Sequence, residues 1–368
     1  MKILYFARGQ SPHDLRFLTA LADSGQQIAV LCLEGNGKYS WPHGVEELGW
    51  RGGKNTPNWP RNFRLARAFK HIVADYRPDV VHAGPIQQVA FIAALARVKP
   101  LLSMSWGSDL LVDANHSFYN RRITRLTLAR TALLAADCQV VVDRAREFGY
   151  HGPVVVFPWG VDLRHFIPGA GGNMRHQLGW DDKKVFLSNR TLESLYGVDV
   201  VARAFAQASR QDDSLRLLLF GRGSQEKLVH TILKDAEAAG KVYFGGFASL
   251  AELPDVYRSA DIYVSASHSD GSSVSLMESL ACGTPALVSD IPANREWLAS
   301  GTAGWLFQDG SVEELARRML DDHSPEELKT FSLQARRLAE ERADWNRNFG
   351  LLLDAYRQLA SANIEISM

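Results

Sequence analysis

The sequence is poor in cysteine and has no long apolar run. Its three cysteines, Cys32, Cys138 and Cys282, are far apart in apolar segments, which argues against a disulfide framework or a zinc site and favours a reducing compartment. The apolar run at the N-terminus covers about five residues, fewer than a signal peptide needs, and no run reaches the roughly 18 residues of a membrane span. These absences predict a cytoplasmic protein.

The sequence also lacks net charge, but the balance is uneven along the chain. Residues 1–166 hold 20 basic and 13 acidic residues, an excess of seven positive charges, which suggests an anionic partner on that side. The segment 48–74 has six basic residues, no acidic residue and interleaved aromatics such as Trp59 and Phe63. It predicts either peripheral contact with an anionic membrane surface, at its inner face, or an ordinary helix with one solvated side. No nucleic-acid partner is expected.

Short apolar strands alternate with amphipathic helices, and the length of 368 residues suggests two domains. The alternation predicts α/β domains with parallel sheets. In the first half, strands are expected at 2–7, 27–33, 79–83, 100–105, 138–142 and 153–157, and helices at 13–25, 60–76, 87–98 and 118–135. In the second half, strands are expected at 184–189, 215–221, 241–246, 261–267, 285–290 and 304–307, and helices at 197–209, 224–239, 250–259, 274–282, 311–320 and over most of the remainder. The domains are expected at 1–165 and 166–345, followed by a helix at 346–368.

The segment 259–290 is the most informative part of the sequence. It reads as a strand, a polar turn and a helix that begins near Val274. Backbone amides at such a helix N-terminus bind anions such as a diphosphate, and here they belong to Gly271, Ser272, Ser273 and Val274. Asp270 and Glu278 flank the turn, and carboxylates accept hydrogen bonds from vicinal hydroxyls such as those of a ribose. Taken alone, the pair equally fits an Asp at a helix start and a surface Glu.

This segment resembles the signature of the retaining GT-B glycosyltransferases of glycosyltransferase family 4, the group 1 enzymes. That signature has two acids with seven residues between them, then Ala-Cys-Gly-x-Pro and a strand ending in Ser-Asp. These features match Asp270–Gly271, Glu278, residues 281–285 and residues 289–290, and further similar elements occur at 160–166, 217–228, 242–264, 301–316 and 344–359. The resemblance implies an α/β GT-B fold. Two Rossmann-like domains, the first for the acceptor and the second for the donor, would face each other across a cleft, with the C-terminal helix returning to the first.

The resemblance further implies transfer of a hexose-type sugar from a UDP- or GDP-sugar to a hydroxyl acceptor with retention of configuration. The acceptor would be a sugar, a lipid-linked molecule or a small molecule, in the synthesis of a cell-surface polysaccharide, a glycolipid or a small glycoside. The sequence has no Asp-x-Asp motif, in agreement with metal-independent transfer without a cofactor. Two alternatives share the fold: a nucleotide-sugar epimerase and a non-catalytic nucleotide-sugar-binding protein.

On the donor side, the resemblance assigns Glu278 to the ribose hydroxyls and Asp270 to the transferred sugar. Asp270 is one methylene shorter than the usual Glu. Arg190 matches the family's Arg that neutralises the diphosphate, but the usual Lys nearby is replaced by Tyr196. Arg222 could supply the missing charge, or it is a solvated loop residue.

Further donor-binding positions implied by the resemblance are Phe247, in the element at 242–264, and Gly9, which retains one glycine of the family's Gly-Gly loop. Other candidates in the first domain lie on the acceptor side. They are His13 at a helix start, and His82, which is either an acceptor contact or a structural residue.

Two residues near the expected strand at 100–105 complete the candidate site. Trp106 replaces the family's His that touches the donor sugar, and an indole N–H can donate a hydrogen bond but cannot act as a base. Asp109 either binds an acceptor hydroxyl or caps the helix that follows it.

Overall fold

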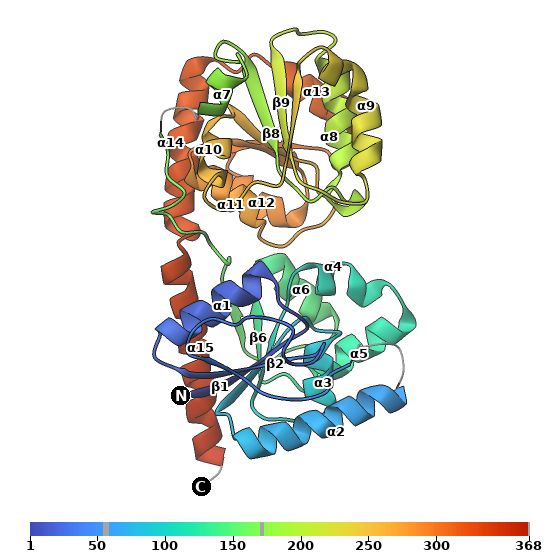
Figure 1. Cartoon of the computed structure of the whole chain (residues 1–368), viewed down its shortest axis with the longest axis vertical. Helices are drawn as coiled ribbons and strands as arrows, with labels where there is room; N and C mark the ends of the chain where they lie inside the picture. The colour runs from blue at the N-terminus through green and yellow to red at the C-terminus, as the bar shows by residue number, and fades with distance from the viewer. Residues whose placement is uncertain (54–58, 170–172, 367–368) are drawn as a thin grey trace. The chain divides into compact units, whose positions relative to one another are not determined.

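The computed structural model describes residues 1–53, 59–169 and 173–366. The chain forms two compact units, one of residues 1–157 with 349–368 and one of residues 158–348 (Figure 1). The sequence had placed these divisions at 165/166 and 345/346. The segment after Phe157 packs with the second unit instead, because Val161 pairs with Asp344 and Phe166 lies in that unit's core.

The N-terminal unit is built on a parallel seven-stranded sheet of order β3-β2-β1-β4-β5-β6-β7. The strands are β1 (Lys2–Ala7), β2 (Gln27–Cys32), β3 (Val45–Glu47), β4 (Val80–Ala83), β5 (Leu101–Met104), β6 (Leu133–Ala136) and β7 (Val154–Val156). The helices are α1 (Pro12–Asp23), α2 (Trp59–Tyr76), α3 (Val89–Leu95), α4 (Ser108–Leu111), α5 (Phe118–Leu128), α6 (Gln139–Glu147) and, from residue 349, α15 (Trp345–Ile366). The central strands are mostly apolar and almost fully buried, as expected of a parallel sheet covered on both faces.

The predictions for residues 118–142 were partly wrong. The helix expected at 118–135 ends at Leu128, and the strand expected at 138–142 is helix α6, while the strand of this region lies at 133–136. Leu and Ala favour helices, but this short segment is fully buried and pairs with both β5 and β7, which outweighs its propensity. The sequence also missed β3, α4 and, in the other unit, α7 (Asn173–Gln177) and α12 (Pro292–Leu298).

The C-terminal unit contains a parallel six-stranded sheet of order β10-β9-β8-β11-β12-β13. Its strands are β8 (Lys184–Ser188), β9 (Leu215–Phe220), β10 (Val242–Gly246), β11 (Ile262–Ser265), β12 (Ala286–Ser289) and β13 (Gly304–Phe307), each within two residues of its predicted bounds. Its remaining helices are α8 (Val198–Ala208), α9 (Glu226–Ala238), α10 (Leu253–Arg258), α11 (Val274–Ala281), α13 (Val312–Leu320) and α14 (Pro325–Arg342). Two apolar clusters form its core.

Strand order reverses once in each sheet, between β1 and β4 and between β8 and β11. Ligands of open parallel sheets bind beyond the carboxyl ends of the strands at such a reversal. The loops after β1 and β4, and those after β8 and β11, are therefore the expected ligand-binding positions.

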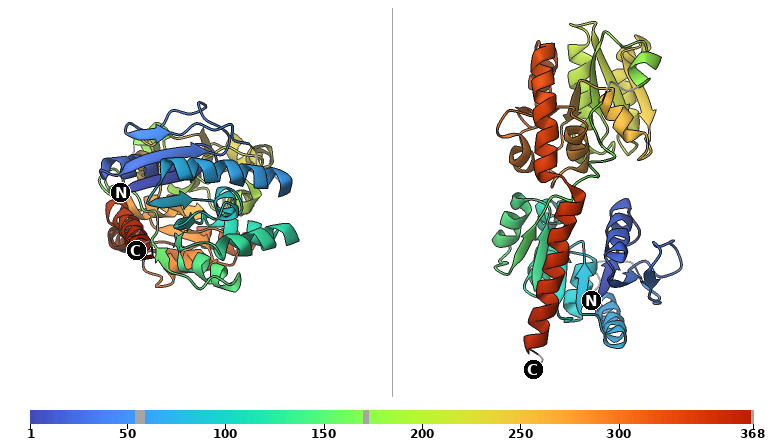
Figure 2. Two further views of the ribbon diagram at one scale, coloured as in Figure 1. Left: turned by 90° about the horizontal axis from the view of Figure 1, so that it is seen from below. Right: turned by 90° about the vertical axis from the view of Figure 1, so that its left-hand side faces the viewer.

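The helix α15 packs along the N-terminal unit over its later residues (Figure 2). Leu352, Ala355 and Tyr356 on this helix are buried. No helix in the described part of the chain combines the length and the hydropathy needed to cross a bilayer.

Candidate functional site

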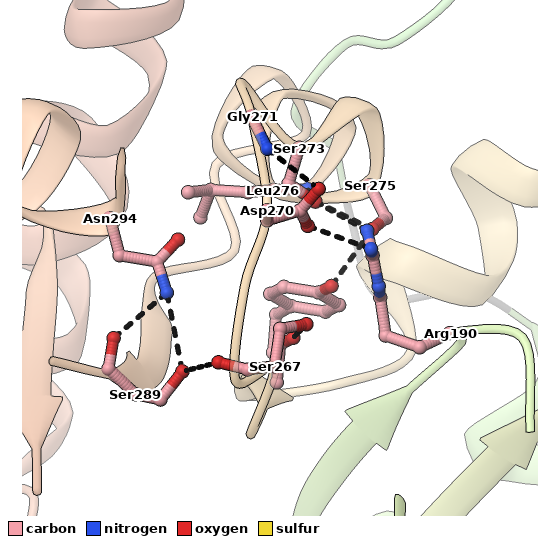
Figure 3. Close-up of polar contacts among 11 residues, drawn as sticks. Arg190, Ser267, Asp270, Gly271, Ser273, Ser275, Leu276, Ser289 and Asn294 are labelled. Atoms are coloured by element: carbon pink, nitrogen blue, oxygen red, sulfur yellow. Dashed lines mark hydrogen bonds and ion pairs between the residues drawn. The ribbon is translucent and has the colours of Figure 1, made fainter. Parts of the chain in front are cut away.

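The reversal point of the C-terminal sheet brings Arg190 and Asp270 into contact. Arg190 follows β8, and Asp270 lies in the loop after the neighbouring strand β11. The Nη2 atom of Arg190 donates to Oδ2 of Asp270 at 2.7 Å, and the two side chains are only 11% and 19% exposed. Figure 3 shows the guanidinium directed at this carboxylate. The family resemblance implied separate ligands for the two residues, a diphosphate for Arg190 and the transferred sugar for Asp270.

Two serines and one aromatic ring also hold the Arg190 guanidinium. Its Nη1 atom donates to Ser273 Oγ at 2.6 Å and to Ser275 Oγ at 2.9 Å. The guanidinium lies 4.2 Å from the ring centroid of Tyr196, the residue that replaces the family's Lys. Burial by itself lowers the pKa of Arg190, but the negative charge of Asp270 outweighs burial and raises the pKa above its usual range, so the group is a permanent cation.

The loop after β11 leads into helix α11 at Val274, as the sequence predicted. Ser273 is the N-cap residue, and its Oγ accepts from the amide of Leu276 at 3.4 Å. The Gly271 amide donates to Asp270 Oδ1 at 3.0 Å. Ser289 fixes the start of this loop by donating to the carbonyl of Ser267, as Figure 3 shows. The loop is thus a defined turn with a carboxylate beside a helix N-terminus.

Glu278 lies one turn along α11 and is 9% exposed. Its Oε2 atom accepts a hydrogen bond from Tyr257 Oη at 2.7 Å, and Tyr257 Oη in turn accepts from Asn189 Nδ2 at 2.7 Å. The chain of three residues fixes the direction of the carboxylate. Tyr257 and Asn189 were not predicted from the sequence, because a tyrosine on a partly apolar helix and an asparagine at the end of a strand are both ordinary.

Arg222 and Phe247 are two further residues predicted to bind the donor. Arg222 follows β9 and forms no side-chain ion pair with any described residue, and Phe247 is 82% exposed in the loop after β10. Within the described chain, neither side chain forms a hydrogen bond or an ion pair with Arg190 or Asp270. The loop of Arg222 is nevertheless close to Arg190, because a Cβ on Gly221 would lie 2.4 Å from the Arg190 carbonyl oxygen.

The reversal point of the N-terminal sheet contains a pocket of about 430 Å³. It is lined by the loops that follow β1, β2, β4 and β5. The lining residues include Gly9, Glu34, Tyr39, Gln88 and Trp106. Tyr39 Oη donates to Glu34 Oε2 at 2.8 Å, and a Cβ on Gly9 would lie 3.1 Å from Tyr39 Oη, so glycine fits the close approach there.

His13 lies on α1 beside this pocket, with its ring in edge contact with Trp106 at 5.8 Å. Burial lowers the pKa of His13 from 6.5 to about 4, with a smaller contribution from Arg16. The imidazole is therefore neutral at neutral pH and can both donate and accept a hydrogen bond.

Asp109 lines the pocket, but its carboxylate faces the protein. It accepts hydrogen bonds from the Ile86, Trp106 and Leu110 amides and from Ser105 Oγ at 2.6–3.1 Å. The carboxylate thus holds the turn between β5 and α4 together. The predicted helix-capping role is wrong, because Asp109 lies within α4 and the N-cap residue of that helix is Gly107, which makes no side-chain capping bond.

The acceptor role considered for His82 is wrong, because this side chain is 1% exposed within β4. Its Nδ1 atom bonds to Tyr356 Oη on α15, and burial lowers its pKa to about 3. His82 is thus a neutral structural residue that anchors the C-terminal helix. No group of three or more His, Cys, Asp and Glu residues suited to a metal ion occurs in the described ranges.

Comparison with known proteins agrees with this geometry. The "Glycosyl transferase 4-like" profile matches residues 2–138, and the "Glycosyl transferases group 1" profile matches residues 172–336. The chain is 24% identical to the phosphatidyl-myo-inositol mannosyltransferase of Mycolicibacterium smegmatis in an alignment of 385 positions. The alignment covers 98% of this chain and 92% of that protein.

Solved structures share the fold over the whole chain. The sucrose-phosphate synthase of Thermosynechococcus elongatus superposes with a TM-score of 0.83 at 17% identity, covering 98% of this chain and 100% of the other. HepE of Anabaena, in complex with UDP, gives a TM-score of 0.79 at 19% identity with the same coverage. With its two parallel-sheet Rossmann-like units of the GT-B fold, the chain belongs to the group 1, family-4-like glycosyltransferases.

Proposed function

We propose that the protein transfers a hexose-type sugar from a nucleotide-sugar to a hydroxyl acceptor with retention of anomeric configuration, without a metal ion or other cofactor. The observation that carries this proposal is the grouping of Arg190, Asp270 and the Tyr257-held Glu278 at the reversal point of one sheet. These groups match, in order, a diphosphate, a sugar hydroxyl and a pair of ribose hydroxyls. The UDP bound by HepE, a protein of the same fold, supports a uridine nucleotide.

Each group has a defined task in this proposal. Glu278 accepts from the ribose hydroxyls, and the amides at the start of α11, with Arg190, stabilise the charge that develops on the leaving diphosphate. Asp270 orients the sugar, and the leaving phosphate takes the acceptor proton on the same face. Catalysis then depends on positioned charge, since neither carboxylate has to act as a nucleophile.

The pocket of the N-terminal unit supports a hydroxyl-rich acceptor. It combines the aromatic rings of Tyr39 and Trp106 with polar side chains such as Gln88 and Glu34. Rings of this kind pack against the apolar faces of sugars, and amides and carboxylates bond to sugar hydroxyls.

The donor assignment is tested by thermal shift and by donor hydrolysis with UDP-, GDP- and ADP-sugars. A donor at 100 times its Kd should stabilise the protein by about 2.7 kcal/mol. Glu278→Ala should abolish the shift and the release of nucleoside diphosphate, whereas Glu313→Ala, on the exposed start of α13, should change neither. If no nucleotide-sugar raises the melting temperature of the native protein, the proposal is wrong.

Retention and metal independence need the transfer reaction itself. Proton NMR of the first product should show the donor's anomeric configuration, and EDTA should leave the rate unchanged. An inverted product, or a rate restored only by added Mg²⁺ or Mn²⁺, would contradict the mechanism.

Helix α2 supports a second proposal, peripheral contact with an anionic membrane. Trp59 and Phe63 are 38% and 56% exposed, and Arg67 and Lys70 continue their face of the helix. Residues 54–58 of the basic segment lie outside the described part of the chain. Flotation with vesicles containing anionic phospholipid should carry the protein upward at low salt, and Phe63→Ser should weaken this. No flotation at low salt would exclude the contact.

A further inference from the structure

We propose that Asp270 and Tyr196 make the donor site discriminate against the free nucleoside diphosphate and in favour of the intact nucleotide-sugar. The inference rests on the proposed function and concerns the same site. It assigns Asp270 a second task, as the counter-ion of the phosphate-binding Arg190.

The structure shows that Arg190 is already engaged. Three of its five N–H groups donate to Asp270, Ser273 and Ser275 at 2.6–2.9 Å, and its flat face rests on Tyr196. Its Nε has no hydrogen-bond partner among the described residues, but this atom is enclosed by protein and is not open to a ligand. An incoming diphosphate therefore competes with Asp270 for a cation that is held in place.

Competition with Asp270 has a different outcome for the two ligands. When Arg190 turns to a phosphate, the largely buried Asp270 carboxylate loses its cation, which is unfavourable unless another donor replaces it. A nucleotide-sugar brings hydroxyls that can donate to this carboxylate. A nucleoside diphosphate brings none to this carboxylate, because its ribose hydroxyls are assigned to Glu278, and its own negative charge lies close to Asp270.

Tyr196 strengthens the effect because it removes the alternative. A Lys at this position would bind the phosphates independently and leave the Arg190–Asp270 pair intact. The ring instead supports the guanidinium at 4.2 Å and contributes no charge of its own. The exchange of Arg190 between Asp270 and phosphate is then required for tight binding.

The test is to measure the affinities of two ligands by isothermal titration calorimetry. One ligand is UDP, and the other is the UDP-sugar that raises the melting temperature of the native protein most. If a GDP- or ADP-sugar raises it more, that sugar nucleotide and its free diphosphate are used instead. Asp270→Asn should bind UDP at least tenfold more tightly than the native protein, equivalent to about 1.4 kcal/mol. Its affinity for the UDP-sugar should not rise in parallel, so the preference for the sugar falls at least tenfold. Tyr196→Lys should also tighten UDP, and UDP should become a stronger competitive inhibitor of donor hydrolysis.

Asp290→Asn is the matched control, because Asp290 follows the adjacent strand β12 and also pairs with an arginine, Arg295, at 2.5 and 2.8 Å. It should leave both affinities unchanged. The inference is overturned if UDP and UDP-sugar bind the native protein but their affinity ratio is the same in Asp270→Asn and Tyr196→Lys. It is also overturned if Asp290→Asn shifts the ratio equally. Failure of the proposed function is a separate result, since no variant would then bind either ligand.

Discussion

Asp109 should contribute stability to the N-terminal unit that grows as the pH falls toward 5, against the opposite contribution of the buried neutral His13 and His82. Its carboxylate is 2% exposed, and burial raises its pKa from 3.8 to about 6, although hydrogen bonds from Ser105 and three amides oppose that rise. Between these two pKa values the folded protein binds a proton that the unfolded chain does not. The resulting stabilisation is complete below pH 3.8 and is lost as the pH rises through about 6. From pH 7.5 to pH 5 the gain is about 1.4 kcal/mol.

The assay compares the native protein with Asp109→Asn, whose amide does not titrate. Because the two units can unfold separately, the free energy of unfolding is followed by hydrogen exchange of the β4 and β5 amides. The native protein should gain about 1.4 kcal/mol over the variant between pH 7.5 and pH 5. Asp143→Asn, on the exposed face of α6, is the control. It keeps Asp109, so its unfolding free energy should change with pH as that of the native protein does. A difference that is flat, or that falls toward pH 5, would mean that the hydrogen bonds outweigh burial, and the argument would fail.

Two further substitutions test the packing around the sites. Gly197→Ala should destabilise the C-terminal unit by more than about 2 kcal/mol, because φ is +56° and the new Cβ would lie 2.0 Å from the Ala266 carbonyl oxygen. Gly240→Ala in the same unit, with φ +68° and no atom within 4 Å, isolates the backbone contribution at about 1 kcal/mol; equal melting-temperature losses would show that the contact does not matter. Tyr356→Phe should lower the unfolding free energy of the N-terminal unit by about 1–3 kcal/mol, because it leaves the buried His82 Nδ1 without this bond, while calorimetric UDP affinity stays unchanged. Unaltered stability would contradict the anchoring role of α15.

The sequence predicted the architecture well because alternating apolar strands and amphipathic helices follow directly from burial on two faces of a parallel sheet. It failed at 133–142, where the local pattern points the other way. The strand at 133–136 consists of Leu and Ala, and the valines at 140–142 belong to a helix that buries only one side. Only the register against β5 and β7 distinguishes the two assignments, and that pairing is not visible in a local window.

The candidate site shows the same limit at the level of side chains. Resemblance identified Arg190, Asp270 and Tyr196 one by one, and it described the last two as departures from the family pattern. The structure indicates that these departures belong together. Arg190 and Asp270 are 80 residues apart, but β8 and β11 are neighbours, so their carboxyl ends place the guanidinium against the carboxylate. With a ring at Tyr196 in place of a second cation, the remaining cation is both supported and neutralised inside the site. A residue-by-residue comparison would count one lost charge and one shortened acid, whereas the geometry describes a single exchangeable ion pair.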